Sequence, residues 1–274
     1  MRVSFTKTPH LDYVIRLMHS IRNDGHEIVD FPKVPESDPA FAEHLQNLDI
    51  CVVWGVAKAK RMKEMGAKNV LIMERAYLGD RAQWLSLGWD DLNGKASFYN
   101  KYVAADRWDR YWKNGMLAWK TTGNYVLVCG QVMRDQSLSD CIDYKKWLND
   151  VCEELKNNGE SVVFRPHPLE EDDYGIPKHV YISTDKNILS DLKRCKAMVT
   201  WSSTTSVLAA YHGVPTCVFS DYSMTNEISS RDIKQLDYMP DRNDWGRKLA
   251  YTQWNADELM NGTAWYHVKT RFYY

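Results

Sequence analysis

Two kinds of hydrophobic pattern alternate along the chain. Short apolar runs, such as Arg2–Phe5 and Ile50–Trp54, are typical of buried strands. Between such runs, apolar residues recur at spacings of three and four, as they do from Leu11 to Met18, which indicates a helix with one buried face. The alternation predicts βαβ units and a mainly parallel sheet, and therefore an α/β fold.

The first part of the chain is expected to contain strands over residues 2–5, 27–31, 50–54 and 69–73. Helices are expected from Leu11 to the stop signal Asn23-Asp24-Gly25, over residues 41–48, and in the lysine-rich stretch after Gly55. From residue 74 to residue 123 the periodicity fades and Gly, Asp, Trp and Tyr dominate. We expect loops and short helices there.

The α/β pattern restarts at Tyr125. Strands are expected over residues 125–129, 161–164, 180–182, 197–200 and 215–219, with helices over 143–158, 187–195 and 203–211. One or two further helices beyond Trp245 are expected to pack back across the molecule. The restart predicts two Rossmann-like halves, residues 1–123 and 124–274, which face a cleft that holds the site.

Composition narrows the class of protein. The chain of 274 residues has 35 Lys+Arg against 36 Asp+Glu and a net charge of −1, so no overall positive field attracts polyanions. No apolar run of about 18 residues is present, and the amino-terminal stretch lacks the pattern of a signal peptide, so we expect a cytoplasmic protein without membrane insertion. Six cysteines without a CxxC pair exclude a zinc knuckle and are expected to be free thiols.

The sharpest local motif is Arg165-Pro166-His167-Pro168, directly after the predicted strand 161–164. Ligands of open α/β sheets bind at the carboxyl ends of strands. Two prolines that stiffen the backbone around an arginine and a histidine suggest that both side chains are aimed at a phosphate. The alternative is a stiffened turn whose polar residues are incidental.

Two further motifs also follow predicted strands. Ser202, Ser203 and Thr204 begin the helix 203–211, where exposed amides and hydroxyls favour an anion, although one hydroxyl suffices as a helix cap. The third motif contains Gly130, whose lack of a side chain permits a close ligand, followed by polar groups suited to phosphate or sugar: Gln131, Arg134 and Ser137. Together the three motifs predict a nucleotide diphosphate site, and the glycine fingerprints of dinucleotide and P-loop sites are absent.

These motifs resemble a known fold family. A strand followed by RPHP, and then a strand followed by SSTTSVLAAYHGVPTCVF, is similar to the carboxyl-terminal half of GT-B glycosyltransferases, above all capsule-type transferases and CDP-glycerol glycerophosphotransferases. The resemblance covers residues 125–232. It implies that Arg165, His167, Ser202 and Ser203 contact the donor phosphates, and that Glu227 contacts the donor ribose or sugar. The chain is short for this fold, which implies a trimmed acceptor domain.

A second resemblance lies in the first half. Residues 74–81 and 86–94 are similar to small glycosyltransferase-like proteins of bacteriophages. Residues 107–113 interleave bases with aromatic rings, and Arg107, Trp108, Arg110 and Trp112 are candidates for acceptor binding by charge and stacking. An amphipathic helix that packs the two halves together explains the same pattern equally well.

Glycosyl transfer with inversion needs a base near the acceptor hydroxyl. Asp80, with Glu74 behind it, is the preferred candidate because both follow the strand 69–73, and His10 and Asp12 after the first strand are alternatives. A surface or capping role is the ordinary default for each carboxylate. Since His167, Arg165 and helix amides can neutralise the leaving diphosphate, no metal is required, and the sequence offers no DxD motif.

The sequence therefore predicts a glycosyltransferase that uses a nucleotide-sugar, expected to be a UDP-sugar, as a monomer or homodimer. The acceptor expected first is the hydroxymethyl group of a modified pyrimidine in phage DNA. One alternative is transfer of a sugar or glycerophosphate to a bacterial surface polysaccharide or lipid-linked precursor. The other is a non-catalytic nucleotide-binding protein.

Overall fold

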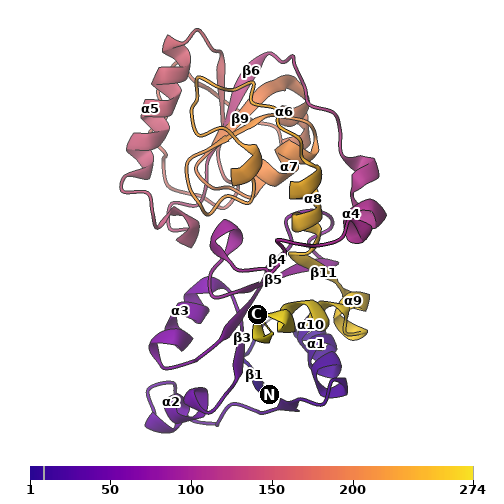
Figure 1. Ribbon diagram of the computed structural model, residues 1–274. Helices are drawn as coiled ribbons and strands as arrows, with labels where there is room; N and C mark the ends of the chain where they lie inside the picture. The colour runs from indigo at the N-terminus through magenta and orange to yellow at the C-terminus, as the bar shows by residue number, and fades with distance from the viewer. Residues whose placement is uncertain (9, 274) are drawn as a thin grey trace. The chain divides into compact units, whose positions relative to one another are not determined.

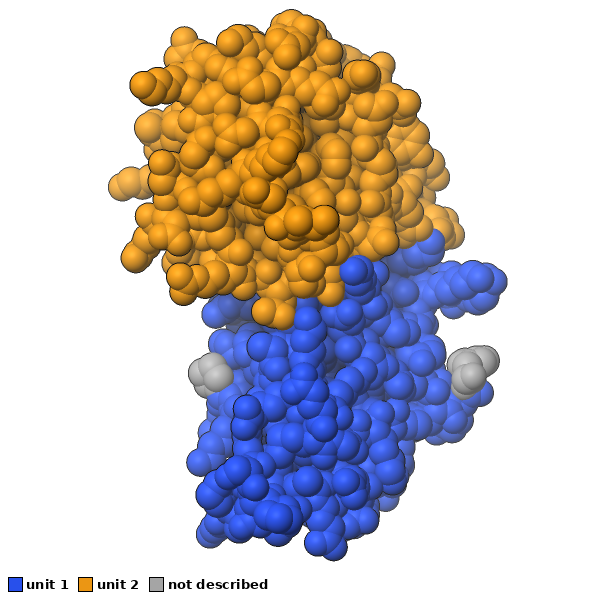
Figure 2. All heavy atoms as spheres, turned by 90° about the vertical axis from the view of Figure 1, so that its left-hand side faces the viewer, with its two compact units in different colours: residues 1–104, 248–274 blue, residues 105–247 orange. Residues whose placement is uncertain are grey.

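A computed structural model describes residues 1–8 and 10–273 (Figure 1). The chain divides into two compact units, shown in different colours in Figure 2. Unit 1 contains residues 1–104 and 248–274, and unit 2 contains residues 105–247. The predicted halves, 1–123 and 124–274, differ from these units in two places, because residues 105–123 belong to unit 2 and the chain after Arg247 returns to unit 1.

Unit 1 is built on one sheet, which has six strands within the described residues, in the order β11-β5-β4-β3-β1-β2. Strands β1 to β4 run parallel to one another, whereas β5 pairs antiparallel with both β4 and β11. The strands are β1 Arg2–Phe5, β2 Glu27–Ile28, β3 Ile50–Trp54, β4 Val70–Arg75, β5 Trp84–Trp89 and β11 Gln253–Asn255. The helices are α1 Leu11–Asn23, α2 Pro39–Gln46, α3 Val56–Glu64, α9 Ala256–Met260 and α10 Thr263–Val268, with 3-10 turns η1 Asn93–Lys95 and η5 Lys269–Phe272.

The core of unit 1 forms where α1 and the carboxyl-terminal helices cover one face of this sheet. Val14, Leu17 and Ile21 recur along α1 at helical spacing and are buried against β1, β3 and β4 together with Leu259 and Trp265. The expectation that the chain returns beyond Trp245 is confirmed. Strand β11 adds to the edge of the sheet, and the side chains of α9 and α10 complete the core.

Strand β5 lies within the stretch for which the sequence predicts loops, so that expectation is wrong for residues 84–89. All six of its residues are buried. A strand that is buried on both faces does not need the alternation of apolar and polar residues by which a half-exposed strand is recognised in a sequence. The glycine at position 88 and the aspartates that follow Trp89 further obscure the pattern.

Unit 2 contains an entirely parallel sheet of five strands in its described chain, in the order β10-β9-β6-β7-β8. The strands are β6 Tyr125–Cys129, β7 Val162–Arg165, β8 Tyr181–Ile182, β9 Cys195–Thr200 and β10 Thr216–Val218. The helices are α4 Asp106–Tyr111, α5 Tyr144–Asn157, α6 Ile188–Arg194, α7 Thr205–Tyr211 and α8 Asn243–Ala250, the last of which continues into unit 1. Short 3-10 turns are η2 Lys113–Gly115, η3 Gln136–Leu138 and η4 Asn226–Ile228. The predicted α/β class is confirmed.

Alternate residues of β6 supply two cores, one on each face of the sheet. Val126 and Val128 pack with the apolar face of α5, whereas Leu127 and Cys129 pack with α6 and α7 (Figure 1). Burial on both faces explains why β6 reads as a continuous apolar run. Since β6 lies between β7 and β9, the loops that follow these three strands emerge side by side at the carboxyl edge of the sheet.

The carboxyl-terminal segment is expected to be essential for the stability of unit 1. Trp254 on β11 is fully buried, so Trp254→Ala should lower the free energy of unfolding by about 3–5 kcal/mol through lost burial and a cavity. Urea unfolding followed by circular dichroism measures the change. The control is Tyr102→Ala at a side chain that is 88% exposed, which should change stability by less than about 0.5 kcal/mol. Equal effects of the two substitutions would contradict this role.

Candidate functional site

The amide of Gln131 joins two of the loops at the carboxyl edge of the unit 2 sheet. This side chain is 4% exposed. Its Nε2 donates to Ser137 Oγ at 3.1 Å and to Ser202 Oγ at 3.0 Å, and its Oε1 accepts from the backbone nitrogen of Ser202 at 2.8 Å. The loop after β6 is therefore tied to the loop after β9 by a buried and satisfied amide.

Tyr174 ties in the third loop. Its hydroxyl donates to the carbonyl of Gln131 at 2.9 Å and accepts from the backbone nitrogen of His167 at 3.2 Å. Burial raises the pKa of Tyr174 to about 12, so the hydroxyl keeps the proton that it donates. The three motifs that the sequence places after strands thus lie together in the structure. Tyr174 itself was not predicted, because nothing in its local sequence marks a tyrosine that pairs across loops.

Gly130 leaves room for two aromatic rings to pack against its backbone. A Cβ at this position would lie 2.9 Å from Phe164 Cζ and 3.0 Å from Tyr174 Cζ. The two rings meet edge to face, with centroids 5.0 Å apart. The glycine is therefore required by the rings that hold the loops, which accounts for it without the close ligand that the sequence suggested.

Arg165 has a structural partner. Its Nη1 donates to Asp191 Oδ2 at 2.7 Å and to the carbonyl of Asp185 at 2.8 Å. Asp191 on α6 is 1% exposed and also accepts from Ser183 Oγ at 2.7 Å. The guanidinium thus neutralises a buried carboxylate, a structural role that neither the predicted phosphate ligand nor the alternative of an incidental residue in a stiffened turn describes.

The environment of Asp191 acts on its ionisation in two directions. Burial raises the pKa of the carboxyl, but hydrogen bonds from Ser183, Arg165 and Tyr125 outweigh burial and hold the pKa below its ordinary value. The carboxyl group of Asp191 is therefore ionised at neutral pH. This ion pair fixes α6 to the end of β7, where the RPHP motif begins.

His167 lies on the surface side of the same loop and is half-buried. Its Nδ1 accepts from the backbone nitrogen of Leu169 at 3.2 Å, which places the proton of a neutral ring on Nε2. Three residues on, Glu170 accepts from the backbone nitrogen of Met133 at 2.6 Å and so links this loop to the loop that carries the exposed Arg134. Backbone hydrogen bonds, the strongest from Met133, lower the pKa of Glu170.

The hydroxyls at the start of α7 divide into two kinds. Ser202 is 1% exposed, and its Oγ donates to the carbonyl of Ser137 at 3.0 Å, so it belongs to the buried clamp. Ser203 Oγ accepts from the backbone nitrogen of Thr205 at 3.3 Å and from its hydroxyl at 2.8 Å. Thr204 makes no side-chain cap and is partly exposed. Glu227 is exposed in η4, in the connection after β10.

The basic and aromatic residues proposed for acceptor binding lie mostly in the interior of unit 2. Trp108 is 1% exposed and packs edge to face against Trp245 and Tyr211, with centroids 6.2 and 6.3 Å away. Arg107 and Trp112 are also buried, whereas Arg110 is exposed. Packing is the better interpretation for the three buried side chains, because an acceptor cannot stack on a covered ring, but this packing lies within unit 2.

In unit 1, the candidate bases lie near the carboxyl end of β4. Asp80 is exposed, and its Oδ1 accepts from the backbone nitrogen of Ala82 at 2.8 Å, as expected for a residue that caps a turn. Glu74 is on β4 itself and partly buried. Its Oε1 lies 3.6 Å from the position of a Cβ on Gly55, which begins the turn after β3.

The carboxyl ends of three unit 1 strands also bring together an aromatic and basic group. His10, after β1, lies against the ring of Trp54 at the end of β3, with centroids 4.0 Å apart. Burial and the positive charge of Arg75, at the end of β4, lower the pKa of the His10 ring. His10 is therefore neutral at pH 7 and able to accept a proton, a role that the sequence gives it only as an alternative to Asp80.

Two features are absent from the described residues. Among residues 1–8 and 10–273, no cluster of three His, Cys, Asp or Glu side chains is arranged to hold a metal ion. No helix in the same residues has the length and apolar character needed to cross a membrane.

Comparison with known proteins identifies the architecture. No protein-family model matches the chain, and no curated protein matches its sequence. Among solved structures, the chain is similar to the β-Kdo 2,7 transferase of Thermosulfurimonas dismutans KpsC, with a TM-score of 0.61 and 12% identity over 96% of this chain and 99% of that one. The β-Kdo 2,4 transferase of the same KpsC gives a TM-score of 0.58 and 15% identity over 92% of this chain and 90% of that one.

The chain has the GT-B fold. The resemblance drawn from the RPHP and SSTTS motifs is confirmed at this level. At 12% and 15% identity, the likeness concerns the path of the backbone. This likeness assigns no role to any side chain of this chain.

The ion pair of Asp191 should make stability depend on pH. Asp191→Asn is expected to lower the free energy of unfolding by about 3 kcal/mol at pH 7, because it leaves Arg165 without its buried partner. Since the pKa of Asp191 is depressed on folding, its contribution is present above the unfolded pKa of about 3.9 and lost as pH falls through the folded value. Urea titrations from pH 7 to pH 3 should show the two proteins converging.

Asp150→Asn is the matched control for this prediction. Asp150 forms an ion pair with Lys146, and the two side chains are 61% and 69% exposed, respectively. Loss of this pair should lower the free energy of unfolding by less than about 1 kcal/mol. A loss of similar size in both variants would remove the case for a structural Arg165.

Proposed function

We propose that this protein is a glycosyltransferase that takes its sugar from a nucleotide-sugar, with the donor bound at the carboxyl edge of the unit 2 sheet. The observation that carries the proposal is the joining of three loops, after β6, β7 and β9, by Gln131 and Tyr174. Buried clamps of this kind hold loops rigidly, as a binding site for a charged ligand requires. The GT-B fold and the likeness to two structures titled as Kdo transferases support sugar transfer.

The donor diphosphate is proposed to lie against His167, Arg134 and the start of α7 at Ser203 and Thr204. The Nε2–H group of His167 can donate a hydrogen bond to a phosphate oxygen, and Arg134 adds a positive charge. Four other residues of these loops act as positioning residues. The side chains of Gln131, Ser202 and Arg165 hold the loops by hydrogen bonds, and Gly130 leaves room for the rings that pack between them. Glu227 remains the proposed contact for the ribose or sugar, and UDP the first nucleotide to test.

For the acceptor, we favour a saccharide such as a growing surface polysaccharide. The similar structures are Kdo transferases. In addition, Arg107, Trp108 and Trp112 are buried, so the main reason to expect a nucleic acid as the acceptor is lost. Modified-pyrimidine DNA is the second candidate, because residues 74–81 and 86–94 resemble phage glycosyltransferase-like proteins.

The proposed reaction needs no group beyond the chain and its two substrates. Asp80, supported by Glu74, accepts the proton of the acceptor hydroxyl while the oxygen forms a bond to the anomeric carbon. The bond from that carbon to the donor phosphate breaks, and its electron pair leaves with the nucleotide. His167 and the amides at the start of α7 stabilise the negative charge that develops on the leaving group.

A panel assay tests the proposal. UDP-, GDP-, CDP- and CMP-activated sugars are incubated with the protein and either oligosaccharides or DNA that contains 5-hydroxymethylpyrimidines, and the products are identified by mass spectrometry. A sugar mass added to an oligosaccharide supports the favoured acceptor, and one added to the base supports DNA. Failure of every donor to bind or react would favour a non-catalytic nucleotide-binding protein.

His167→Ala is expected to lower the rate of transfer by about 10²- to 10³-fold, because a donor to the leaving phosphate is lost. The fold should be retained, since the side chain lies at the surface and is half-buried. His167→Gln, which keeps an N–H donor, should restore part of the rate. Steady-state kinetics measures the transfer rates of both variants, and thermal unfolding checks that each variant is folded. Full activity of the alanine variant would exclude His167 from the donor site.

Asp80→Asn is expected to lower kcat by about 10²- to 10⁴-fold, with the KM for the donor unchanged, because only proton transfer from the acceptor is affected. Glu74→Gln should have a smaller effect of the same kind. His10→Gln is the discriminating control. If that variant loses activity and Asp80→Asn does not, then the neutral His10 is the base and the assignment to Asp80 is wrong.

A further inference from the structure

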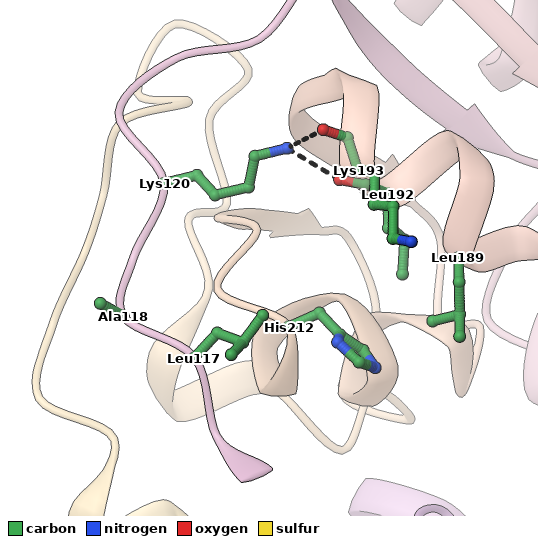
Figure 3. Close-up of a pocket in the computed structure, with 7 residues that line it drawn as sticks. All are labelled: Leu117, Ala118, Lys120, Leu189, Leu192, Lys193 and His212. Atoms are coloured by element: carbon green, nitrogen blue, oxygen red, sulfur yellow. Dashed lines mark hydrogen bonds between the residues drawn. The ribbon is translucent and has the colours of Figure 1, made fainter.

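Unit 2 contains a cavity of about 230 Å³ at the edge of the sheet opposite the candidate donor site. Three segments enclose it, namely residues 117–120, helix α6 and the carboxyl end of α7 at His212 (Figure 3). Strand β9 begins at Cys195, directly after α6, and reaches the candidate donor site only at its far end, before Ser202. The cavity is therefore separate from the proposed site of transfer.

The walls of the cavity are mainly apolar. Leu117, Leu189 and Leu192 contribute side chains from two different segments. Leu117 is 54% exposed and Leu189 is partly exposed, so apolar surface remains open to water inside a concave site. Concave apolar surface with a few polar groups is characteristic of small-molecule sites. Since water occupies about 30 Å³ per molecule, the cavity has room for about eight waters or a short aliphatic chain.

The charges around the cavity have one sign. Lys120 and Lys193 supply the charges, His212 is a third polar lining residue, and none of the described residues that line the cavity is acidic. Lys120 is fixed in place, because its Nζ donates to the carbonyls of Leu192 at 2.8 Å, Lys193 at 3.0 Å and Cys195 at 2.6 Å. Burial and the neighbouring charge of Lys193 lower the pKa of His212. His212 is therefore neutral at pH 7 and can offer an N–H group to a bound anion, while Lys193 supplies the positive charge.

We propose that this cavity binds a small amphipathic anion. The aliphatic or aromatic body of the ligand lies against Leu117, Leu189 and Leu192, and its carboxylate or phosphate faces Lys193 and His212. Figure 3 shows the side chains of Lys193, Leu189 and His212 on the same side of the cavity, whereas the ammonium of Lys120 turns toward the backbone of α6.

Octanoate is the probe, and octanol is its neutral counterpart. Calorimetric titration of the full chain should show saturable octanoate binding, with octanol about tenfold weaker because it lacks the charge. Hexanoate should also bind roughly tenfold more weakly than octanoate, since two fewer methylene groups are buried. Equal binding of octanol and octanoate, or the absence of saturable octanoate binding, would overturn the proposal.

Substitutions then locate the site. Lys193→Glu should weaken octanoate by about tenfold or more, while Lys186→Glu, a matched change at an exposed lysine outside the cavity, should leave the affinity unchanged. Leu117→Trp should block binding by filling the space, and Leu189→Ser serves the same purpose if the larger side chain prevents folding. Unaltered affinity in Lys193→Glu, or the same loss in Lys186→Glu, would show that octanoate binds elsewhere.

Discussion

A buried amide must satisfy its hydrogen-bonding groups within the protein, and in unit 2 this requirement positions the candidate site. Gln131 meets it through Ser137 and Ser202, which belong to different loops. Its backbone carbonyl accepts a hydrogen bond from the hydroxyl of Tyr174, and this hydroxyl also accepts a hydrogen bond from the backbone nitrogen of His167. Because a partly satisfied buried network is costly, the loops after β6, β7 and β9 are held to one arrangement. The geometry of the proposed donor site depends on this network.

The same reasoning separates residues that hold the site from residues that face a ligand. Arg165 and His167 are two positions apart in one motif, yet the first neutralises Asp191 and the second lies at the surface with Nδ1 bonded to its own loop. Ser202 and Ser203 divide in the same way at the start of α7. A polar motif after a strand thus contains residues that hold the loops together and residues that are proposed to contact a ligand, and their hydrogen-bond partners distinguish the two.

The sequence predicts the parallel strands and the meeting of their loops, because both follow from local hydrophobic runs and from the rule that parallel strands end at one edge. It does not predict β5, whose residues are buried on both faces, or β11, which has three residues and pairs with β5 through contacts far along the chain. It also cannot distinguish a stacking platform from a packed core at Trp108, because the partner Trp245 lies in a distant helix. The partners of Arg165 and Gln131 are likewise tertiary.

The central claim is that a donor nucleotide binds at the carboxyl edge of the unit 2 sheet. Hydrogen exchange of the full chain, measured by mass spectrometry with and without UDP or CMP, tests it most directly. The account predicts slower exchange in residues 130–137, 166–170 and 201–206, with little change at the opposite edge around residues 117–120 and His212. Protection confined to unit 1, or to the opposite edge of the unit 2 sheet, would contradict the account.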